Sequence, residues 1–329
     1  MSKYACSPVF LLYKKGQNTM AIKTVQAVIN GQTYNLTLME GETKKYKATP
    51  TAPGDSSFNL EGGYYPVQVK VEDTAGNTVE ADHTHSTLGA NLRLYAKEQQ
   101  KPAITILEPT NGAYVTSTSK PVVRFKVVDN NTQTSGYSGV KKDSLVLKVN
   151  GNVIDNSKVE WTDTEGGFIG TYTPETDLAN GEYTVSVDCS DNDGNAAATA
   201  TSTFTIDTAA PSLDLTSPEE GFETNKPSIE IKGTTNDEHS KPVRINITLN
   251  GIDQGDVTVN EDGSFSKVIN FTQQGANVIE VTATDSAGLV TKITRNVVFN
   301  TTAPVIKSVT IDPNPVYCGT VYEIIVEVE

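Results

Sequence analysis

The chain has few of the residues on which most catalytic and metal sites depend. Its 329 residues include three histidines, one tryptophan and three cysteines. Cys6, Cys189 and Cys318 are scattered and odd in number, so we expect no disulfide framework and interpret the thiols as small core hydrophobes. The chain also lacks a Gly-x-Ser-x-Gly elbow, a phosphate-binding glycine loop and a His-Glu-x-x-His motif, and we therefore expect a protein that is not an enzyme.

Positive charge is also scarce. Lysine and arginine number 26 against 40 aspartates and glutamates, which gives a formal net charge of −14. This surplus repels phosphates and anionic lipids, and we find no clustered basic stripe, so no nucleic-acid partner is expected. The same charge is typical of proteins that stay soluble on a particle surface or outside the cell.

Long hydrophobic runs are missing. No run approaches the roughly 20 apolar residues of a transmembrane helix, so no membrane insertion is expected. Residues 8–13 are short for a signal-peptide core of about 7 to 15 residues, and no Ala-x-Ala-like cleavage site follows them. We therefore expect synthesis in the bacterial cytoplasm without a signal peptide.

The first nineteen residues have a different interpretation. The codons for Lys14-Lys15-Gly16 contain a purine-rich AAGG a few codons before Met20, as a bacterial ribosome-binding site would. We therefore predict that translation naturally starts at Met20 and that residues 1–19 are a non-native extension.

What the chain does contain is a repeated turn. An Asp-x-x-Gly sequence at residues 73–76, 191–194 and 285–288 each time follows a run of alternating apolar residues. Linkers that contain proline recur with it, and the period of roughly 90 to 110 residues fits one small β-domain. The sequence predicts a non-native extension at 1–19, domains at 20–100, 101–209 and 210–302, and a short C-terminal two-strand segment at 303–329.

Strands and hairpins follow from local patterns. Val67, Val69 and Val71 fall on one face of an alternating run, which is typical of a half-buried antiparallel strand. Asn-Gly at 30–31, 150–151 and 250–251 predicts type I′ hairpins, because both central positions need a positive φ. About seven short strands per unit and almost no helix predict an all-β fold of tandem immunoglobulin-like β-sandwiches in an elongated array.

The last predicted unit is incomplete. Residues 305–311 and 322–328 read as two strands, and two strands do not form a stable sandwich alone. We expect this segment to pair with the preceding domain, with a second subunit in self-association, or with a partner protein.

The turn of the second unit resembles the start of a calcium loop. Asp191, Asp193 and Asn195 offer alternating oxygen ligands around Gly194. However, the glutamate that should follow is replaced by residues 196–199, and the other two turns lack the second carboxylate. The favoured interpretation is a structural turn in which aspartate caps its own backbone, with calcium at one junction as the alternative and no other cofactor.

A second metal pattern is weaker. His83 and His85 would lie on the same face of a strand, as in a His-x-His metal pair, but no third ligand is evident.

Aromatic residues provide the candidates for sugar binding, because carbohydrate rings stack on flat aromatic faces. These ligand or adhesion candidates are Tyr64, Tyr65, Tyr114, Trp161 and Phe222, with Phe222 at the place equivalent to Tyr114. Packing in the core or in hairpins is the favoured interpretation of these rings, and contact with host cell-wall glycans is the alternative.

Four segments carry a resemblance to a known family. They are MAIKTVQA at 20–27, GGYYPV at 62–67, THSTLG at 84–89 and DPNPV at 312–316. From about Met20 onward the chain resembles bacterial Ig-like repeat proteins encoded in tail regions of phages and prophages of Gram-positive, clostridia-type hosts. The resemblance implies a virion or tail-associated structural module that helps adhesion to the host envelope, and it transfers no catalytic residue.

The resulting hypothesis is a non-enzymatic phage virion structural protein, a tail or baseplate accessory whose Ig-like modules mediate host-surface adhesion. Its expected location is the virion, and its expected partners are tail or baseplate proteins and host cell-wall glycans. One alternative is a bacterial cell-surface adhesin, which would need a signal peptide and an anchor. The other is a carbohydrate- or cell-wall-binding protein associated with lysis.

Overall fold

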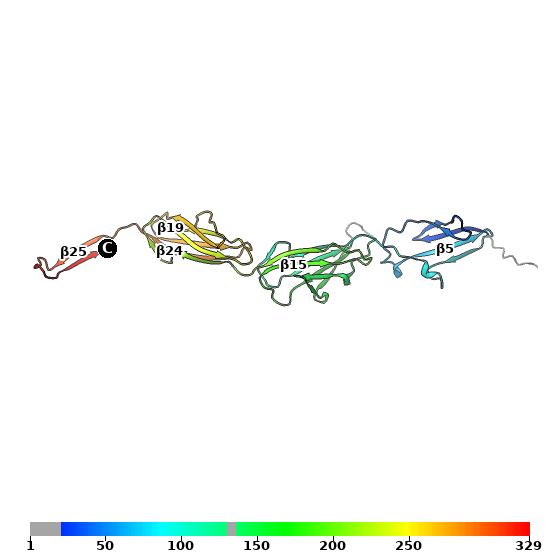
Figure 1. Ribbon diagram of the computed structural model, residues 1–329, viewed down its shortest axis with the longest axis horizontal. Helices are drawn as coiled ribbons and strands as arrows, with labels where there is room; N and C mark the ends of the chain where they lie inside the picture. The colour runs from blue at the N-terminus through cyan, green and yellow to red at the C-terminus, as the bar shows by residue number, and fades with distance from the viewer. Residues whose placement is uncertain (1–20, 130–135) are drawn as a thin grey trace, which may run out of the picture.

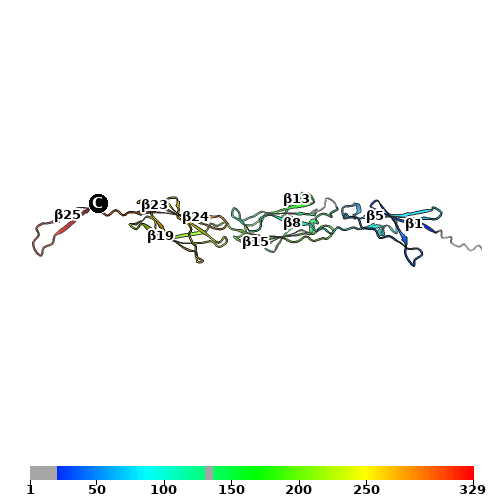
Figure 2. The same cartoon turned by 90° about the horizontal axis from the view of Figure 1, so that it is seen from above.

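The chain forms a row of β-domains along one axis. A computed structural model describes residues 21–129 and 136–329, so the prediction for residues 1–19 lies outside the described residues. Two perpendicular views show the domains following one another in chain order (Figures 1 and 2). The predicted all-β fold of tandem Ig-like domains in an elongated array is therefore confirmed.

Helical structure is limited to four short 3-10 turns among the described residues. They are η1 (Glu61–Gly63), η2 (Gly89–Asn91), η3 (Lys142–Ser144) and η4 (Asn156–Lys158). None of the helices described is long and apolar enough to cross a membrane.

The second domain is a sandwich of two antiparallel sheets. One sheet has the order β13-β14-β10-β8, and the other has the order β12-β11-β15-β16 with the edge strand β9 parallel to β16. Val123, Phe125 and Val127 alternate inward from β10 and are at most 1% exposed, which is why this segment forms a half-buried strand. The strands are β8 (Ala103–Glu108), β9 (Ala113–Val115), β10 (Val123–Val128), β11 (Val146–Val149), β12 (Asn152–Ile154), β13 (Glu160–Thr164), β14 (Gly167–Tyr172), β15 (Gly181–Asp188) and β16 (Ala200–Ile206).

The third domain repeats this plan. Its sheets have the orders β17-β19-β22 and β18-β24-β23-β20-β21, with β18 parallel to β24 at the position that β9 has in the second domain. Ile231, Ile247 and Ile279 are fully buried between the two sheets. The strands are β17 (Ser212–Ser217), β18 (Phe222–Thr224), β19 (Ser228–Asn236), β20 (Arg244–Leu249), β21 (Ile252–Asp253), β22 (Ser264–Asn270), β23 (Gly275–Thr284) and β24 (Val290–Phe299).

The first domain departs from this plan. Its main sheet has the order β2-β1-β5-β6 with β7 on β5, and β3 and β4 form a separate two-stranded sheet. Residues 48–57 are rich in proline, threonine, serine and glycine and lack apolar alternation, so they form no strands. The strands are β1 (Ile22–Ile29), β2 (Gln32–Asn35), β3 (Thr37–Leu38), β4 (Tyr46–Lys47), β5 (Tyr65–Asp73), β6 (Thr78–Ala81) and β7 (Arg93–Leu94).

The predicted hairpin turns are present in all three domains. Asn30, Asn150 and Asn250 have φ values of 49°, 48° and 53°, and the following glycines are also at positive φ. Each Asn-Gly pair joins two antiparallel strands, β1-β2, β11-β12 and β20-β21. The type I′ prediction is confirmed in its backbone conformation.

The C-terminal segment forms a two-stranded hairpin from β25 (Ile306–Asp312) and β26 (Glu323–Val328). Among the described residues these strands pair only with each other, so the expected pairing with the preceding domain does not occur. Every residue of the hairpin is exposed, and it lies beyond the third domain at one end of the array (Figure 1).

Candidate functional site

Buried carboxylates gather at the two junctions between domains. In each junction, three acidic side chains offer oxygens that lie within 4.8 Å of one another. The first cluster is Glu98, Asp129 and Asp191, and the second cluster is Asp207, Asp237 and Asp285. All six side chains are less than 9% exposed, although acidic residues are rarely buried unless they are paired.

The two clusters are built from the same three places in the fold. A linker acid comes from the segment that leads into the next domain, a strand-end aspartate directly follows β10 or β19, and a turn aspartate opens the Asp-x-x-Gly turn after β15 or β23. The linker acids are Glu98 and Asp207, the strand-end aspartates Asp129 and Asp237, and the turn aspartates Asp191 and Asp285. Each cluster therefore joins a linker to the domain that follows it.

The first cluster has a dense hydrogen-bond shell. The backbone amide of Gly139 donates to Asp129 Oδ2 at 2.6 Å, and the amide of Asn195 donates to Asp191 Oδ1 at 2.8 Å. The Asn195 side-chain amide donates to Glu98 Oε1 at 3.2 Å and to Asp191 Oδ2 at 2.7 Å. The buried Ser138 hydroxyl lies 3.3 Å from Glu98 Oε1.

The second cluster accepts a similar but smaller set of hydrogen bonds. The backbone amides of His239 and Ser240 each donate to Asp237 Oδ1 at 2.8 Å. The buried Ser240 hydroxyl donates to Asp207 Oδ2, and the amide of Leu289 donates to Asp285 Oδ1 at 2.9 Å. Because residue 289 is leucine where the second domain has Asn195, no side-chain amide reaches the turn aspartate here.

One carboxylate oxygen in each cluster has no partner. Asp129 Oδ1 and Asp285 Oδ2 are shielded from solvent and have no hydrogen-bond partner among the described residues. Buried polar atoms are nearly always hydrogen-bonded, so these two oxygens are free acceptors in the interior.

The electrostatics of the first cluster reflect its burial. Burial, together with the nearby carboxylates of Asp191 and Asp129, raises the pKa of Glu98 to about 7. Burial also raises the pKa of Asp129, and the charges of Asp191 and Asp193 add to this effect. The three negative charges are therefore costly to hold side by side.

In the second cluster, backbone amides counteract the effect of burial on the pKa of Asp237. Burial alone would raise the pKa of Asp237, but the amides of Ser240 and His239 donate to its carboxylate and hold the pKa below its usual value. Asp237 is therefore kept ionised inside the junction.

The turns adopt the structure that the sequence predicts. The aspartates at 73, 191 and 285 each accept the backbone amide four residues later, and the glycines at 76, 194 and 288 are all at positive φ. The structural-turn interpretation is therefore confirmed for the backbone. In the second and third domains the same turn also supplies a member of a carboxylate cluster.

The residues of the predicted calcium loop take different positions. Asp191 belongs to the first cluster, whereas the Asp193 carboxylate accepts the backbone amide of Glu98 at 3.0 Å. Asn195 faces the cluster through its side-chain nitrogen. Sequence reasoning missed Glu98 and Asp129 as well as the whole second cluster.

The five aromatic candidates do not converge on one surface. Tyr65 is buried and its hydroxyl donates to Asp55 O, while Tyr64 packs against His83 and Tyr95 beneath the Arg93 guanidinium. Trp161 packs edge-on against Phe125 and Phe168 of the second core. The remaining two, Tyr114 and Phe222, are partly exposed on edge strands of different domains.

The predicted equivalence of Tyr114 and Phe222 is wrong by one residue. Gly112 and Gly221 make the same backbone hydrogen bond to β16 and β24, which aligns Phe222 with Ala113. The repeat spacing alone could not fix this register, because Ala113–Val115 is apolar at all three positions and has no alternation that distinguishes neighbouring registers.

The predicted histidine pair is also not on a strand. His83 and His85 lie in turns after β6, where His85 Nδ1 accepts the amides of Thr87 and Leu88. His83 packs on Tyr64 instead. The two imidazoles therefore do not form the pair that strand alternation predicts.

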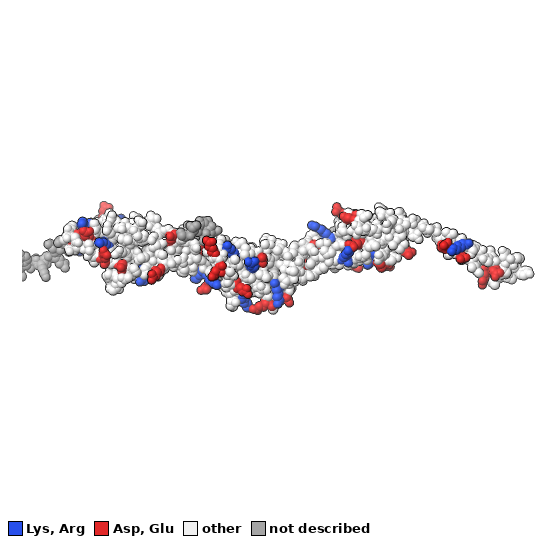
Figure 3. Space-filling view, turned by 180° about the vertical axis from the view of Figure 1, so that it is seen from behind, with Lys and Arg blue, Asp and Glu red and all other residues white. Residues whose placement is uncertain are grey.

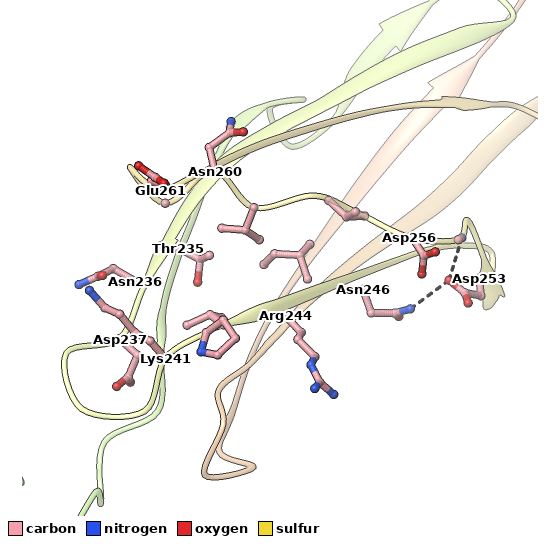
Figure 4. A pocket seen from close by; sticks show the side chains of 17 residues that line it. Thr235, Asn236, Asp237, Lys241, Arg244, Asn246, Asp253, Asp256, Asn260 and Glu261 are labelled. Carbon is pink, nitrogen blue, oxygen red and sulfur yellow. Dashed lines mark hydrogen bonds between the residues drawn. The ribbon is translucent and has the colours of Figure 1, made fainter. Parts of the chain in front are cut away.

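An open hollow of about 650 Å³ lies on the third domain between β20 and the segment 254–263. Figure 4 shows Asp237 and Lys241 at one end of this hollow and Asp253 and Asp256 at the other. Apolar side chains of Val243, Ile245, Val257 and Val259 contribute to its lining. No aromatic ring lines it, so it does not offer the stacking surface expected of a glycan site.

Charged side chains on the surface are mixed. Acidic and basic residues alternate along the face shown in Figure 3, without a continuous basic area. The ion pairs described all join exposed or half-exposed side chains, and none includes a cluster residue.

Two segments of the chain match known family models. Residues 114–208 match the family model "Bacterial Ig-like domain", and residues 211–301 match "Glucodextranase, domain B". The chain is similar to Bacillopeptidase F of Bacillus subtilis, with 32% identity over 162 residues, which are 48% of this chain and 11% of that protein.

Two solved structures have weak overall similarity. The fibronectin(III)-like modules of Clostridium thermocellum CbhA share 18% identity, cover 60% of this chain and 94% of their own, and give a TM-score of 0.35. Immunoglobulin domains 1–4 of Sidekick-1 share 10% identity, cover 85% of this chain and 68% of their own, and give a TM-score of 0.36. The two family models and the sheets described above together support a protein of tandem Ig-like domains.

Proposed function

We propose that this chain is a non-enzymatic structural protein of a phage virion, a tail or baseplate accessory that presents Ig-like modules to the host surface. The observation that carries the proposal is the end-to-end arrangement of the domains, which suits a spacer (Figure 1). The family resemblance of the sequence segments at 20–27, 62–67, 84–89 and 312–316 supports the phage setting.

Contacts at the junctions support a spacer in which neighbouring domains hold one another. Between the first two domains, the amide of Ser56 donates to Gly136 O at 2.8 Å and the Asn59 side chain donates to Tyr137 O at 2.9 Å. At the next junction the Ser240 hydroxyl of the third domain donates to Asp207 Oδ2 at the end of the second domain. Such contacts restrict the motion that a linker alone would allow.

The C-terminal hairpin is the proposed assembly contact. Val309, Ile311, Ile324 and Val326 pair across the hairpin on one face, and they are between 42% and 58% exposed. The outer edges of both strands are unpaired among the described residues, and such edges accept a further strand from another chain. Many copies on one particle would add weak host contacts through avidity.

One observation favours a second candidate function. The similarity to Bacillopeptidase F of Bacillus subtilis favours an accessory module of a bacterial protein over a virion component. In that case the array would act as an adhesin or as a wall-binding spacer.

Mass spectrometry of purified, induced phage particles tests the proposal, with antibody-gold labelling to locate the protein. Stoichiometric peptides together with gold at the tail support the virion role. Absence from intact particles, with the protein recovered in the cell-surface fraction, would contradict it and favour the second candidate.

A further inference from the structure

The two carboxylate clusters carry more negative charge than their surroundings neutralise. Each cluster gathers three buried acids, and none of the six forms an ion pair with a described lysine or arginine. Transfer of an unpaired charge into a protein interior is unfavourable, and buried charges in proteins are paired or coordinate a metal. A bound cation would neutralise this charge at each junction.

The unpartnered oxygens are consistent with a bound cation. Asp129 is 1% exposed and Asp285 is 5% exposed, and each keeps one oxygen without a hydrogen-bond donor. The turn aspartate of the first domain provides the contrast. Asp73 belongs to no described cluster, and both of its oxygens accept hydrogen bonds, from Ala75, Asn77 and the Asn77 side chain.

The size and chemistry of the clusters select the kind of cation. Calcium binds oxygen ligands at about 2.3 to 2.6 Å, so two ligands on opposite sides of one ion lie about 5 Å apart. The clustered oxygens, all within 4.8 Å of one another, fit this limit. The clustered ligands are carboxylates, without sulfur or imidazole, and this disfavours zinc. Magnesium requires a near-ideal octahedron of ligands, whereas calcium accepts less regular geometry, so calcium is favoured over magnesium.

We infer that each junction binds one calcium ion, in the first cluster between domains one and two and in the second cluster between domains two and three. In each case the linker acid and two aspartates of the following domain share the ion. Binding thus fixes the linker against the next sandwich, and it makes the angle between neighbouring domains depend on calcium. The inference goes beyond the proposed function and holds whether the chain belongs to a phage particle or to a bacterial protein.

A calcium titration of the full-length protein, first stripped with EDTA, tests the inference by counting ions in competition with a chromophoric chelator. We expect two ions per chain for the wild type and one each for Asp129→Asn and Asp285→Asn. The double variant should bind none. Asparagine keeps the hydrogen bonds that Asp129 and Asp285 accept from Gly139 and Leu289, so both variants should fold.

Asp193→Asn is the matched control. Its carboxylate lies beside the first cluster but accepts the amide of Glu98, a role that an asparagine oxygen retains. This variant should therefore still bind two ions. Loss of a site in Asp193→Asn, with both sites kept in Asp129→Asn, would place calcium in the turn itself and overturn the inference.

Thermal unfolding followed by the fluorescence of Trp161 adds a readout for the first junction, because this is the chain's one tryptophan and it lies in the second domain. Calcium should raise the midpoint temperature of the Trp161 transition in the wild type and in Asp285→Asn, but not in Asp129→Asn. Without calcium, Asp129→Asn should melt higher than the wild type, because one repelling charge is gone.

The inference fails if neither bound ions nor a shift in midpoint is detected at about 10 mM calcium, above the weakest affinities of extracellular calcium modules. Tighter binding of magnesium than of calcium would also overturn it. All these measurements use purified protein, so absence of the chain from phage particles would leave the calcium result unchanged.

Discussion

At the residue scale, the three Asn-Gly turns show how directly a local sequence can set local structure. Asn150 adopts a left-handed conformation, and its side-chain oxygen also accepts the amide of Thr184 at 2.7 Å. Asn250 repeats both features with the amide of Val278 at 2.8 Å. These turns depend on two adjacent residues, so the sequence was sufficient to predict them.

Replacing the turn asparagine of the second domain should weaken that domain alone. Asn150→Ala removes a hydrogen bond and places alanine in a left-handed conformation, so we expect a loss of about 1 to 2 kcal/mol in the free energy of unfolding. Denaturant unfolding followed by Trp161 fluorescence measures it. Asn250→Ala, the same change in the third domain, should leave the denaturant midpoint of the Trp161 transition unchanged. An equal shift of that midpoint in both variants would contradict the expectation that the second domain unfolds separately from the third.

The two cysteines that the structure describes should differ sharply in reactivity. Cys189 is buried in the second core, and burial raises the pKa of its thiol to about 12, whereas Cys318 is exposed. Because the thiolate is the reactive form, iodoacetamide at neutral pH should label Cys318 and spare Cys189 until the protein unfolds. Peptide mass mapping gives the result, and rapid labelling of native Cys189 would contradict the described core.

The carboxylate clusters mark the limit of prediction from the sequence. Glu98, Asp129 and Asp191 are far apart in the chain and meet only because two sheets and a linker converge. The turn aspartate was recognised from its own motif, but its partners have no motif of their own. A signal was present, however, in the order of the acids: a linker acid, a strand-end aspartate and a turn aspartate recur in the second and third units.

At the element scale, the alternating runs predicted the strands well, and the departures have physical reasons. The second and third domains form two-sheet sandwiches because both halves of each unit carry apolar alternation. The first domain keeps one main sheet, since residues 48–57 offer turn formers where a second sheet would need apolar residues. Sequence patterns predict the register of short edge strands such as β9 and β18 less well than that of longer strands.

Removing the C-terminal hairpin should not affect the stability of the domains. Its strands pair only with each other among the described residues, so they add no packing to the third sandwich. A chain ending at residue 302 should therefore melt at the same temperature as the full chain in calorimetry. If the hairpin is also the assembly contact, the truncated protein should self-associate less at high concentration.

A lower melting temperature of the truncated chain would contradict this description. It would mean that the hairpin packs against a domain in solution. Unchanged self-association, measured by analytical ultracentrifugation, would rule out the hairpin as the assembly contact without contradicting the described fold.

At the scale of the whole molecule, the domains form an extended array whose junctions are reinforced by contacts between linkers and loops. The order of domains and their elongated arrangement follow from the repeats and the short linkers, and both could be predicted from the sequence. The way in which each junction is fixed could not, because it depends on contacts between a linker and loops of the next domain. These include the bonds from Ser56 to Gly136 and from Ser240 to Asp207.

Small-angle X-ray scattering of the purified full-length chain tests the central claim most directly. The longest strands of the three domains, β5, β15 and β23, have nine, eight and ten residues. At about 3.3 Å per residue each domain is about 30 Å long, so three in a row span about 90 Å, to which the linkers and the C-terminal hairpin add. An extended array should have a radius of gyration of about 30 Å or more and a maximum dimension that shortens stepwise when domains are removed. A radius near 20 Å, as expected for a compact fold of 329 residues, would contradict it.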